Sequence, residues 1–273
     1  MDIQAKYIKH VNIKGLWNKY DISWELRPDV NILSGLNGAG KSTIMRHSIS
    51  FLSGKYNKTA VKIPVTVDIQ FDDPDATFIE YDYIAAYDRP LIQGEFTAQM
   101  AEPQVQSEMD WQIYLLQRRY LDYQVNIGNK MIELLSGSPK DQAKAPLLAN
   151  PKRRFQDLLD ELFSYTNKKI DRKSNEICFY QDDEKISVYK LSAGEKHILV
   201  ILLTALLRVG EHSVLFMDEP ESSLHIEWQE QLINNIRSLN PDIQLILTTH
   251  SPALIMQGWV DAVTEVSSIS KRI

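Results

Sequence analysis

The pattern of apolar and polar positions divides the chain into a strand-rich first third, a helical middle, and a last part where strands and helices alternate. In the first third, short runs rich in β-branched and aromatic residues are typical of strands. The predicted strands are Ala5 to Ile13, Ile22 to Leu26, Val30 to Ser34, Lys62 to Phe71 and Thr77 to Ile84. We expect the first two to form a hairpin and the last two to flank a turn.

The middle of the chain has helical periodicity. Apolar and polar residues recur at helical spacing from Ser107 to Leu135, which predicts one long helix or a helix pair. A second helix is predicted after Asn150-Pro151, a cap residue followed by proline at the first helical position. The apolar face of this second helix carries Phe155, Leu158, Leu159, Leu162 and Phe163.

Beyond Glu176, short apolar strands alternate with helices, which favours a largely parallel sheet. Strands are predicted at Ile177 to Tyr180, Ile186 to Tyr189, Ser213 to Met217 and Ile243 to Thr248, and helices from Ala193 and from near His225. We expect one domain over residues 1–273, with core lobes at approximately 1–95 and 175–273 and a helical insertion at approximately 96–174.

The strongest local motif is GLNGAGKST, which fits the phosphate-binding pattern G-x-x-x-x-G-K-[ST] between a short apolar strand and a helix. Glycines let successive backbone N–H groups point at phosphates, and the helix N-terminus adds a positive dipole. Lys41 is expected to bridge the β- and γ-phosphates of ATP, and Ser42 to ligate Mg²⁺. The residues predicted to bind ATP here are Gly35, Asn37, Gly38, Ala39, Gly40, Lys41, Ser42 and Thr43.

A second motif is the apolar strand Val214 to Met217, which ends in two carboxylates. Asp218 is expected to hold Mg²⁺, and Glu219 to act as the catalytic base that polarises the attacking water. A phosphate-binding loop alone fits kinases, GTPases, helicases and transporters, so the motifs that complete the site decide the class.

Two further segments resemble motifs of ABC ATPases. Leu191 to Lys196 reads LSAGEK and resembles the signature LS-x-G-[QE], which implies that Ser192, Gly194 and Glu195 meet a γ-phosphate held by a second subunit. Leu247 to Pro252 reads LTTHSP and resembles the histidine switch, which implies that His250 is catalytic. On the same resemblance, residues 221–224 would be the D-loop, which touches the opposite subunit.

The four motifs in this order resemble an ABC-type P-loop ATPase, and their details resemble the SMC, RecF and OLD-like branch. The signature carries Glu195, and the acidic strand continues as DEPESSLH where transporters have DEPTSALD. The opening segment Val11 to Leu16 is also similar to this branch, which implies that Lys14 reaches the nucleotide. The whole chain is most similar to small bacterial proteins described as predicted ATP-binding proteins involved in virulence. This resemblance implies an α/β fold with a mainly parallel core sheet, an antiparallel β-lobe and a helical insertion.

Two assignments within the resemblance stay open. Such ATPases join Mg²⁺ to the helical lobe through a glutamine, for which Gln93 is the candidate metal ligand and Gln99 and Gln104 are alternatives. Trp17 and Tyr20 are available to stack on adenine, although ordinary packing or surface positions fit both.

Composition limits the cellular compartment and the kinds of partner that fit the chain. The single cysteine, Cys178, excludes an intramolecular disulfide and fits a reducing cytoplasm. The longest apolar run, Ile198 to Leu207, is too short to cross a bilayer, so we expect no membrane segment. A net charge of -6 and a pI near 5.6 give no overall footprint for nucleic acid.

The sequence therefore predicts a cytoplasmic ATPase that forms a homodimer on binding ATP and Mg²⁺. The resemblance points to DNA maintenance or defence against phage, with DNA and a separately encoded effector such as a nuclease as partners. The alternative is the nucleotide-binding subunit of an ABC transporter. A third reading is a regulator whose ATP-closed dimer displays a surface to a partner.

Overall fold

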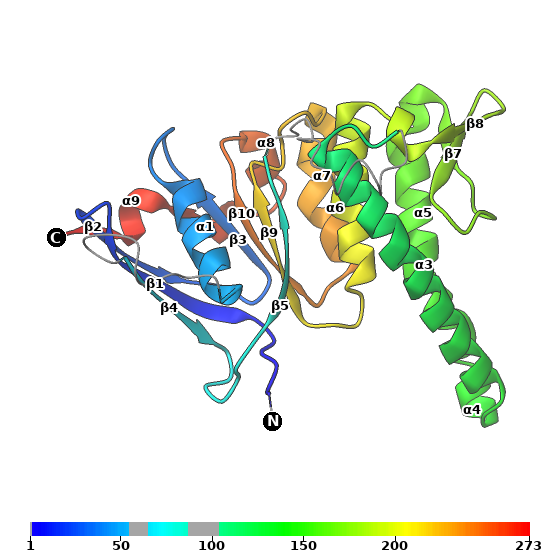
Figure 1. Ribbon diagram of the computed structural model, residues 1–273, viewed down its shortest axis with the longest axis horizontal. Coiled ribbons are helices and arrows are strands. Elements are labelled where there is room, and N and C mark those ends of the chain that lie inside the picture. The colour runs from blue at the N-terminus through cyan, green and yellow to red at the C-terminus, as the bar shows by residue number, and fades with distance from the viewer. Residues whose placement is uncertain (1, 55–64, 87–103) are drawn as a thin grey trace, which may run out of the picture.

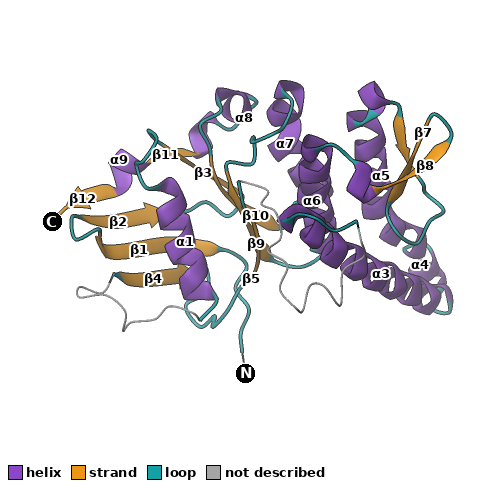
Figure 2. Ribbon diagram, turned by 45° about the horizontal axis from the view of Figure 1, so that its top comes forward, coloured by secondary structure: helices purple, strands orange, loops and turns teal. Residues whose placement is uncertain are grey.

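The computed structural model describes residues 2–54, 65–86 and 104–273. Figure 1 shows these ranges as successive layers: an antiparallel sheet, helix α1 (Lys41–Leu52), a parallel sheet, a group of helices and a small third sheet. Figure 2 shows the antiparallel sheet and the helical group on opposite sides of the parallel sheet. This is the expected α/β class, with a mainly parallel core sheet and an antiparallel lobe.

The antiparallel sheet is built on the predicted hairpin, in the order β12-β2-β1-β4. Its strands are β1 (Ile8–Leu16), β2 (Tyr20–Glu25), β4 (Thr66–Phe71) and β12 (Ser270–Arg272). One face of β1 is buried against α1 (Lys41–Leu52), and the strand pairs antiparallel with both β2 and β4. The hairpin prediction is confirmed.

The central sheet is parallel throughout the described residues, in the order β11-β3-β10-β9-β5. Its strands are β3 (Val30–Ser34), β5 (Glu80–Ile84), β9 (Ser213–Asp218), β10 (Ile243–Thr248) and β11 (Val263–Glu265). Side chains of β9 alternate between the core on the α1 side, which takes Val214 and Phe216, and the helical core, which takes Leu215 and Met217. A sheet covered on both faces explains why β9 and β10 are mostly apolar and fully buried.

The strands on either side of the turn near residue 73 lie in different sheets. β4 ends in the antiparallel sheet, whereas β5 pairs parallel with β9 at the edge of the central sheet. The chain therefore crosses between the two sheets at this turn.

The helical group contains the two predicted amphipathic helices. Its long helices are α3 (Glu108–Leu135), α5 (Asn150–Leu162), α6 (Ala193–Leu207) and α7 (Ile226–Leu239). The predicted helix from Ser107 to Leu135 is one helix, closed at its start by a capping box between Ser107 and Asp110. The predicted cap at Asn150 was wrong by one residue, because a 3-10 turn (Ala145–Ala149) runs directly into α5.

The remaining short helices are α4 (Pro139–Gln142), α8 (Pro252–Met256), α9 (Val266–Ile269) and the 3-10 turns η2 (Ser164–Thr166), η3 (Val188–Lys190) and η4 (Val260–Ala262). α3 extends away from the sheets, and α4 lies at its far end (Figure 1). None of the helices in the described ranges has an apolar stretch long enough to span a bilayer.

A third sheet lies beyond the helices and consists of β6 (Lys168–Ile170), β7 (Cys178–Gln181) and β8 (Glu184–Ser187). The strands predicted near residues 177–189 therefore exist, but β7 and β8 form an antiparallel hairpin outside the parallel sheet. Asp182 and Asp183 at its turn both have positive φ, which is typical of a tight hairpin turn.

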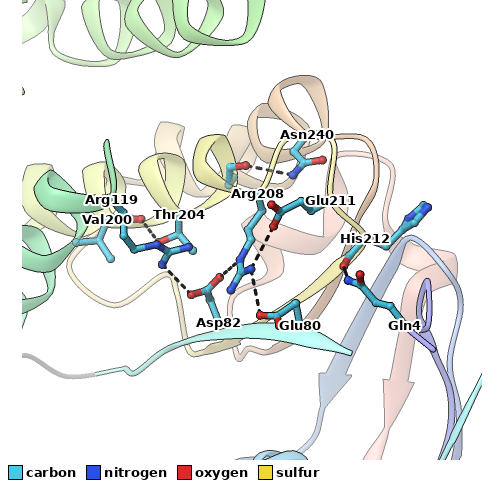
Figure 3. A network of polar contacts seen from close by, with 11 residues as sticks. Gln4, Glu80, Asp82, Arg119, Val200, Thr204, Arg208, Glu211, His212 and Asn240 are labelled. Carbon is cyan, nitrogen blue, oxygen red and sulfur yellow. Dashed lines mark hydrogen bonds and ion pairs between the residues drawn. The ribbon is translucent and has the colours of Figure 1, made fainter. Parts of the chain in front are cut away.

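An ionic network attaches the helices to the edge of the parallel sheet (Figure 3). Asp82 of β5 accepts hydrogen bonds from Arg119 of α3 at 3.1 Å and from Arg208, beside the end of α6, at 2.7 Å. Arg208 also pairs with Glu80 and Glu211. One carboxylate thus links β5, α3 and the C-terminal end of α6.

Candidate functional site

The phosphate-binding loop, the acidic pair and the His250 loop meet at one edge of the parallel sheet. They follow β3, β9 and β10, and β10 lies between the other two strands. Because the strands are parallel, their carboxyl ends lie at the same edge, which is where ligands bind in open α/β sheets. Residues about 200 positions apart in sequence therefore become neighbours.

The loop after β3 turns tightly before α1 begins at Lys41. Gly40 has a φ of 103°, in the left-handed region that favours glycine. The Lys41 side chain is 5% exposed and bends back over the loop, where Nζ donates to the carbonyls of Gly35 at 3.1 Å and Leu36 at 3.4 Å. Burial lowers the pKa of Lys41, and the nearby carboxylates of Glu219, Asp218 and Glu221 offset part of that shift.

The two predicted Mg²⁺ ligands from different motifs lie together. Ser42 Oγ donates to Asp218 Oδ1 at 2.8 Å, and Thr248 Oγ1 donates to the same oxygen at 2.6 Å. A hydroxyl and a carboxylate are the hard oxygen donors that Mg²⁺ prefers, so this donor set fits the ion. No role was predicted for Thr248. A hydroxyl at the end of a buried strand next to the acidic pair could have indicated a polar contact with Asp218.

Glu219 has an unusual backbone conformation for a non-glycine residue, with a φ of 49°. Its N–H donates both to the carbonyl oxygen and to Oγ1 of Thr248, each at 3.1 Å. Its carboxylate lies 3.5 Å from Nε2 of His250. The two residues predicted to be catalytic are therefore brought together by the ends of β9 and β10.

A cavity of about 410 Å³ opens beside these residues. Its lining includes Ser42, Asp218 and Glu219 from the predicted motifs, together with Arg46, Tyr83, Ala85, Ala86 and Glu108. Arg46, Tyr83 and Glu108 were not predicted to belong to the site, and nothing in their local sequence distinguishes them. The signature residues of the same chain are not part of the described lining.

The predicted signature forms the start of α6. Ser192 is the N-cap residue, whose Oγ accepts from the Glu195 N–H at 3.3 Å, while Glu195 Oε2 accepts from the Ser192 N–H at 2.9 Å. The other oxygen of Glu195 accepts from Lys168 and Thr166, each at 2.8 Å. Because Glu195 is only 2% exposed and both oxygens are bonded, its carboxylate fixes the turn and is not turned towards a ligand.

Gly194 lies against the turn that follows the acidic pair. A Cβ atom at this position would lie 2.4 Å from the carbonyl oxygen of Ser223, so any larger residue would displace that turn. The glycine of the signature is thus required for packing within the chain.

The β1–β2 hairpin places Trp17 against the phosphate-binding loop. A Cβ at Gly40 would lie 2.3 Å from Cη2 of Trp17, whose side chain remains 47% exposed. Tyr20 contacts Trp17 edge to face, with ring centroids 6.4 Å apart. Lys14 is exposed on β1 of the same hairpin. Of the two candidate aromatics, Trp17 contacts Gly40 in the loop.

The glutamine predicted to complete the metal site is not placed. Gln93 and the alternative Gln99 lie outside the described residues. Gln104 is described, and it lines a different cavity together with Gln117 and Tyr189.

The family model that matches the chain is the "AAA domain, putative AbiEii toxin, Type IV TA system", over residues 128–256. The retron Vc95 probable ATPase of Vibrio cholerae serotype O1 biovar El Tor is 24% identical over 103 residues, 34% of this chain and 20% of that protein. The retron Ec83 probable ATPase of Escherichia coli is 28% identical over 99 residues, 32% of this chain and 18% of that protein. The chain thus spans about a fifth of the length of these relatives.

Among solved structures, an SMC head bound to the C-winged helix domain of ScpA aligns with a TM-score of 0.56 at 13% identity, covering 98% of this chain and 97% of that chain. A likeness at this identity concerns the fold. Together with the family match and the retron relatives, it supports the resemblance to P-loop ATPases of the SMC, RecF and OLD-like type.

Proposed function

We propose that the protein binds ATP with Mg²⁺ and hydrolyses it in two composite sites formed between two copies of the chain. The observation that carries the proposal is the meeting of Lys41, Ser42, Asp218, Glu219 and His250 at one edge of the parallel sheet. Each of these side chains matches one step of phosphoryl transfer to water.

In the proposed reaction, the side chains of the site position the phosphates, Mg²⁺ and the attacking water and neutralise the phosphate charge. Lys41 and the loop N–H groups would hold the β- and γ-phosphates, and Ser42 and Asp218 would hold Mg²⁺, which neutralises charge on the phosphate oxygens. Glu219 would accept the proton of the attacking water, and His250, 3.5 Å from it, would help to order that water. Trp17 offers an exposed ring next to the loop on which the base would stack.

The composite arrangement rests on the signature. Ser192 and Gly194 start a 15-residue helix, but within one chain they do not contribute to the described lining of the cavity at Ser42 and Asp218. A second copy would bring its helix N-terminus, with its positive dipole, to the γ-phosphate. Binding ATP would then close the dimer.

We further propose a cytoplasmic setting in which the ATP-closed dimer gates a partner, either DNA or a separately encoded effector such as a nuclease. The similar SMC head is described as bound to a winged-helix domain of another protein, which supports a docking function for this fold. The similar retron proteins are named probable ATPases, which supports the ATPase part of the proposal.

Mixing two inactive variants tests the composite site. Lys41→Ala removes the phosphate-binding cation, and Ser192→Arg blocks the signature. In a mixed dimer, one site would combine the intact loop of one chain with the intact signature of the other. Neither variant alone has an intact site, whereas each mixed dimer has one intact site of two, so activity should return on mixing, up to about half of the wild-type activity. No recovery in dimers shown to be mixed would contradict independent composite sites.

A further inference from the structure

The turn from Glu219 to Leu224, between β9 and α7, contacts two parts of the site. On one side lies the loop that carries His250. Glu221 Oε1 accepts three hydrogen bonds from that loop: from Thr249 Oγ1 at 2.6 Å, from the His250 N–H at 2.9 Å and from the Ser251 N–H at 3.2 Å. A single carboxylate oxygen thus fixes three consecutive residues.

These bonds involve an ionised acceptor, which makes them stronger and shorter than bonds between neutral groups. The second oxygen, Oε2, is buried and has no hydrogen-bond partner among the described residues. A buried carboxylate oxygen without a partner is costly, so the arrangement is not the one that stability alone would favour. Its evident result is a fixed backbone at His250.

On the other side, the same turn is held by the signature helix. The buried ring of His197 donates through Nδ1 to the carbonyl of Ser222 at 2.9 Å, since a carbonyl can only accept. The carbonyl of Ser223 lies against Gly194. The turn is therefore anchored on α6 within its own chain.

We propose that Glu221 is a positioning residue that holds His250 at the phosphate site, and that its turn joins the signature helix to the phosphate site of the same chain. This inference rests on the proposed ATPase function. Glu221 acts through His250, whose Nε2 lies 2.5 Å from Lys41 Nζ and 3.5 Å from Oε1 of Glu219. A change in the signature helix would reach His250 through the turn.

Removing the carboxylate should slow the chemical step and spare ATP binding, because Glu221 contacts the loop that carries His250, whereas phosphate binding is assigned to Lys41. Glu221→Ala should lower kcat about 10- to 100-fold, as expected for a lost partner of a catalytic group, with KM and ATP affinity little changed. Glu221→Gln keeps an acceptor oxygen and the side-chain shape, so it should recover part of that loss. Glu227→Gln, an exposed neighbour on α7, is the matched control and should leave kcat unchanged.

A double-mutant cycle separates positioning from a general structural effect. In a His250→Ala background, adding Glu221→Ala should cause no further loss of kcat, because the group it positions is gone. The inference would be overturned if the kcat losses of Glu221→Ala and His250→Ala multiply in the double variant. It would also be overturned if Glu221→Ala has the kcat of the wild type. If Glu221→Ala does not fold, the same cycle is run with Glu221→Gln. Absence of ATP turnover in the wild-type protein would instead overturn the proposed function, so the two failures are distinguishable.

Discussion

Lys41 Nζ lies 2.5 Å from Nε2 of His250, although the two residues are 209 positions apart in the sequence. An ammonium group can only donate, so Nε2 is the acceptor in this contact. The residue proposed to bind the phosphates and the residue proposed to order the attacking water are therefore in direct contact. A phosphate oxygen that binds Lys41 would change the surroundings of His250 at the same time.

The first prediction follows from Lys41. Lys41→Ala removes the cation that faces the β- and γ-phosphates, and ATP affinity measured by calorimetry should fall roughly 100-fold or more. Lys140→Ala, on the exposed helix α4, serves as the charge-matched control. Wild-type affinity in Lys41→Ala would show that the loop is not the phosphate site.

The second prediction concerns the signature. Ser192→Arg should leave ATP binding by the monomer intact. It should block hydrolysis, because the arginine side chain would occupy the position of the γ-phosphate of the ATP bound to the second copy. Ser192 is also the N-cap of α6, so loss of the cap alone should cost about 1 kcal/mol of stability. Ser192→Ala measures that cost without adding a cation. Turnover by Ser192→Arg at the wild-type rate would contradict the composite site.

Much of the fold was predictable because most elements carry their own local signals. The strand Val30–Ser34 and the helix starting at Ala193 have the predicted limits, since a short, mostly apolar run marks the strand and a capping box marks the start of the helix. The assignment of strands to sheets was not predictable. β5 and the β7–β8 hairpin are short, and which partner a short strand pairs with is decided by tertiary packing.

The site was predictable where a motif fixes both residue type and spacing, as at Lys41, Ser42 and Asp218. The contact between Glu221 and the His250 loop was not predictable, because most of the hydrogen-bond donors are backbone groups 28 to 30 residues away in the sequence. The inward orientation of Glu195 also depends on Lys168 of a separate hairpin, to which no sequence motif points.

The third prediction concerns the pH dependence of stability. Burial raises the pKa of Glu195, but hydrogen bonds from Lys168, the Ser192 N–H and Thr166 outweigh it, so the net pKa is below its usual value. A carboxyl group with a lowered folded pKa stabilises the fold above its unfolded pKa of about 4.3, and that contribution is lost as the pH falls through the folded value. Glu195→Gln leaves Lys168 without its charge partner and should cost about 3–5 kcal/mol at neutral pH.

The measurement is urea unfolding of wild type and Glu195→Gln at a series of pH values. The difference in unfolding free energy should be largest above about pH 5 and should shrink towards acid, because only the wild type loses the carboxylate. Glu184→Gln, on the exposed side of β8, controls for general charge effects. A difference that stays constant with pH would show that the ionised form of Glu195 is not what stabilises the turn.

The fourth prediction concerns the base. Trp17→Ala should weaken ATP binding about 5- to 150-fold, because stacking of a base on an aromatic side chain contributes about 1–3 kcal/mol. Trp17→Phe should retain most of the affinity. Trp111→Ala, on α3 where Trp111 stacks on Tyr114, is the control. Equal ATP affinity in Trp17→Ala and wild type would show that the ring packs on the loop without meeting the base.

The fifth prediction concerns Glu219→Gln, which keeps the size of the side chain and removes the carboxylate that would accept a proton from water. Hydrolysis should fall by about 10²- to 10⁴-fold while ATP binding survives. The Glu219 N–H bonds to Thr248 belong to the backbone, so the strained turn should remain in place. The oligomeric state is then measured by light scattering with ATP and Mg²⁺, with ADP, and without nucleotide.

Since each ATP would contact Lys41 of one copy and Ser192 of the other, binding and dimer closure are linked, and ATP stabilises the dimer by mass action. Blocked turnover removes the route by which the dimer reopens, so the variant should be dimeric with ATP and clearly less so in the other two conditions. Adding Ser192→Arg to Glu219→Gln should abolish the ATP-dependent dimer without restoring hydrolysis. If the oligomeric state is the same in all three conditions, the dimer is permanent. The distance between labels on the two copies is then measured with and without ATP, and a shorter distance with ATP would show closure. An unchanged distance would contradict ATP-driven clamping.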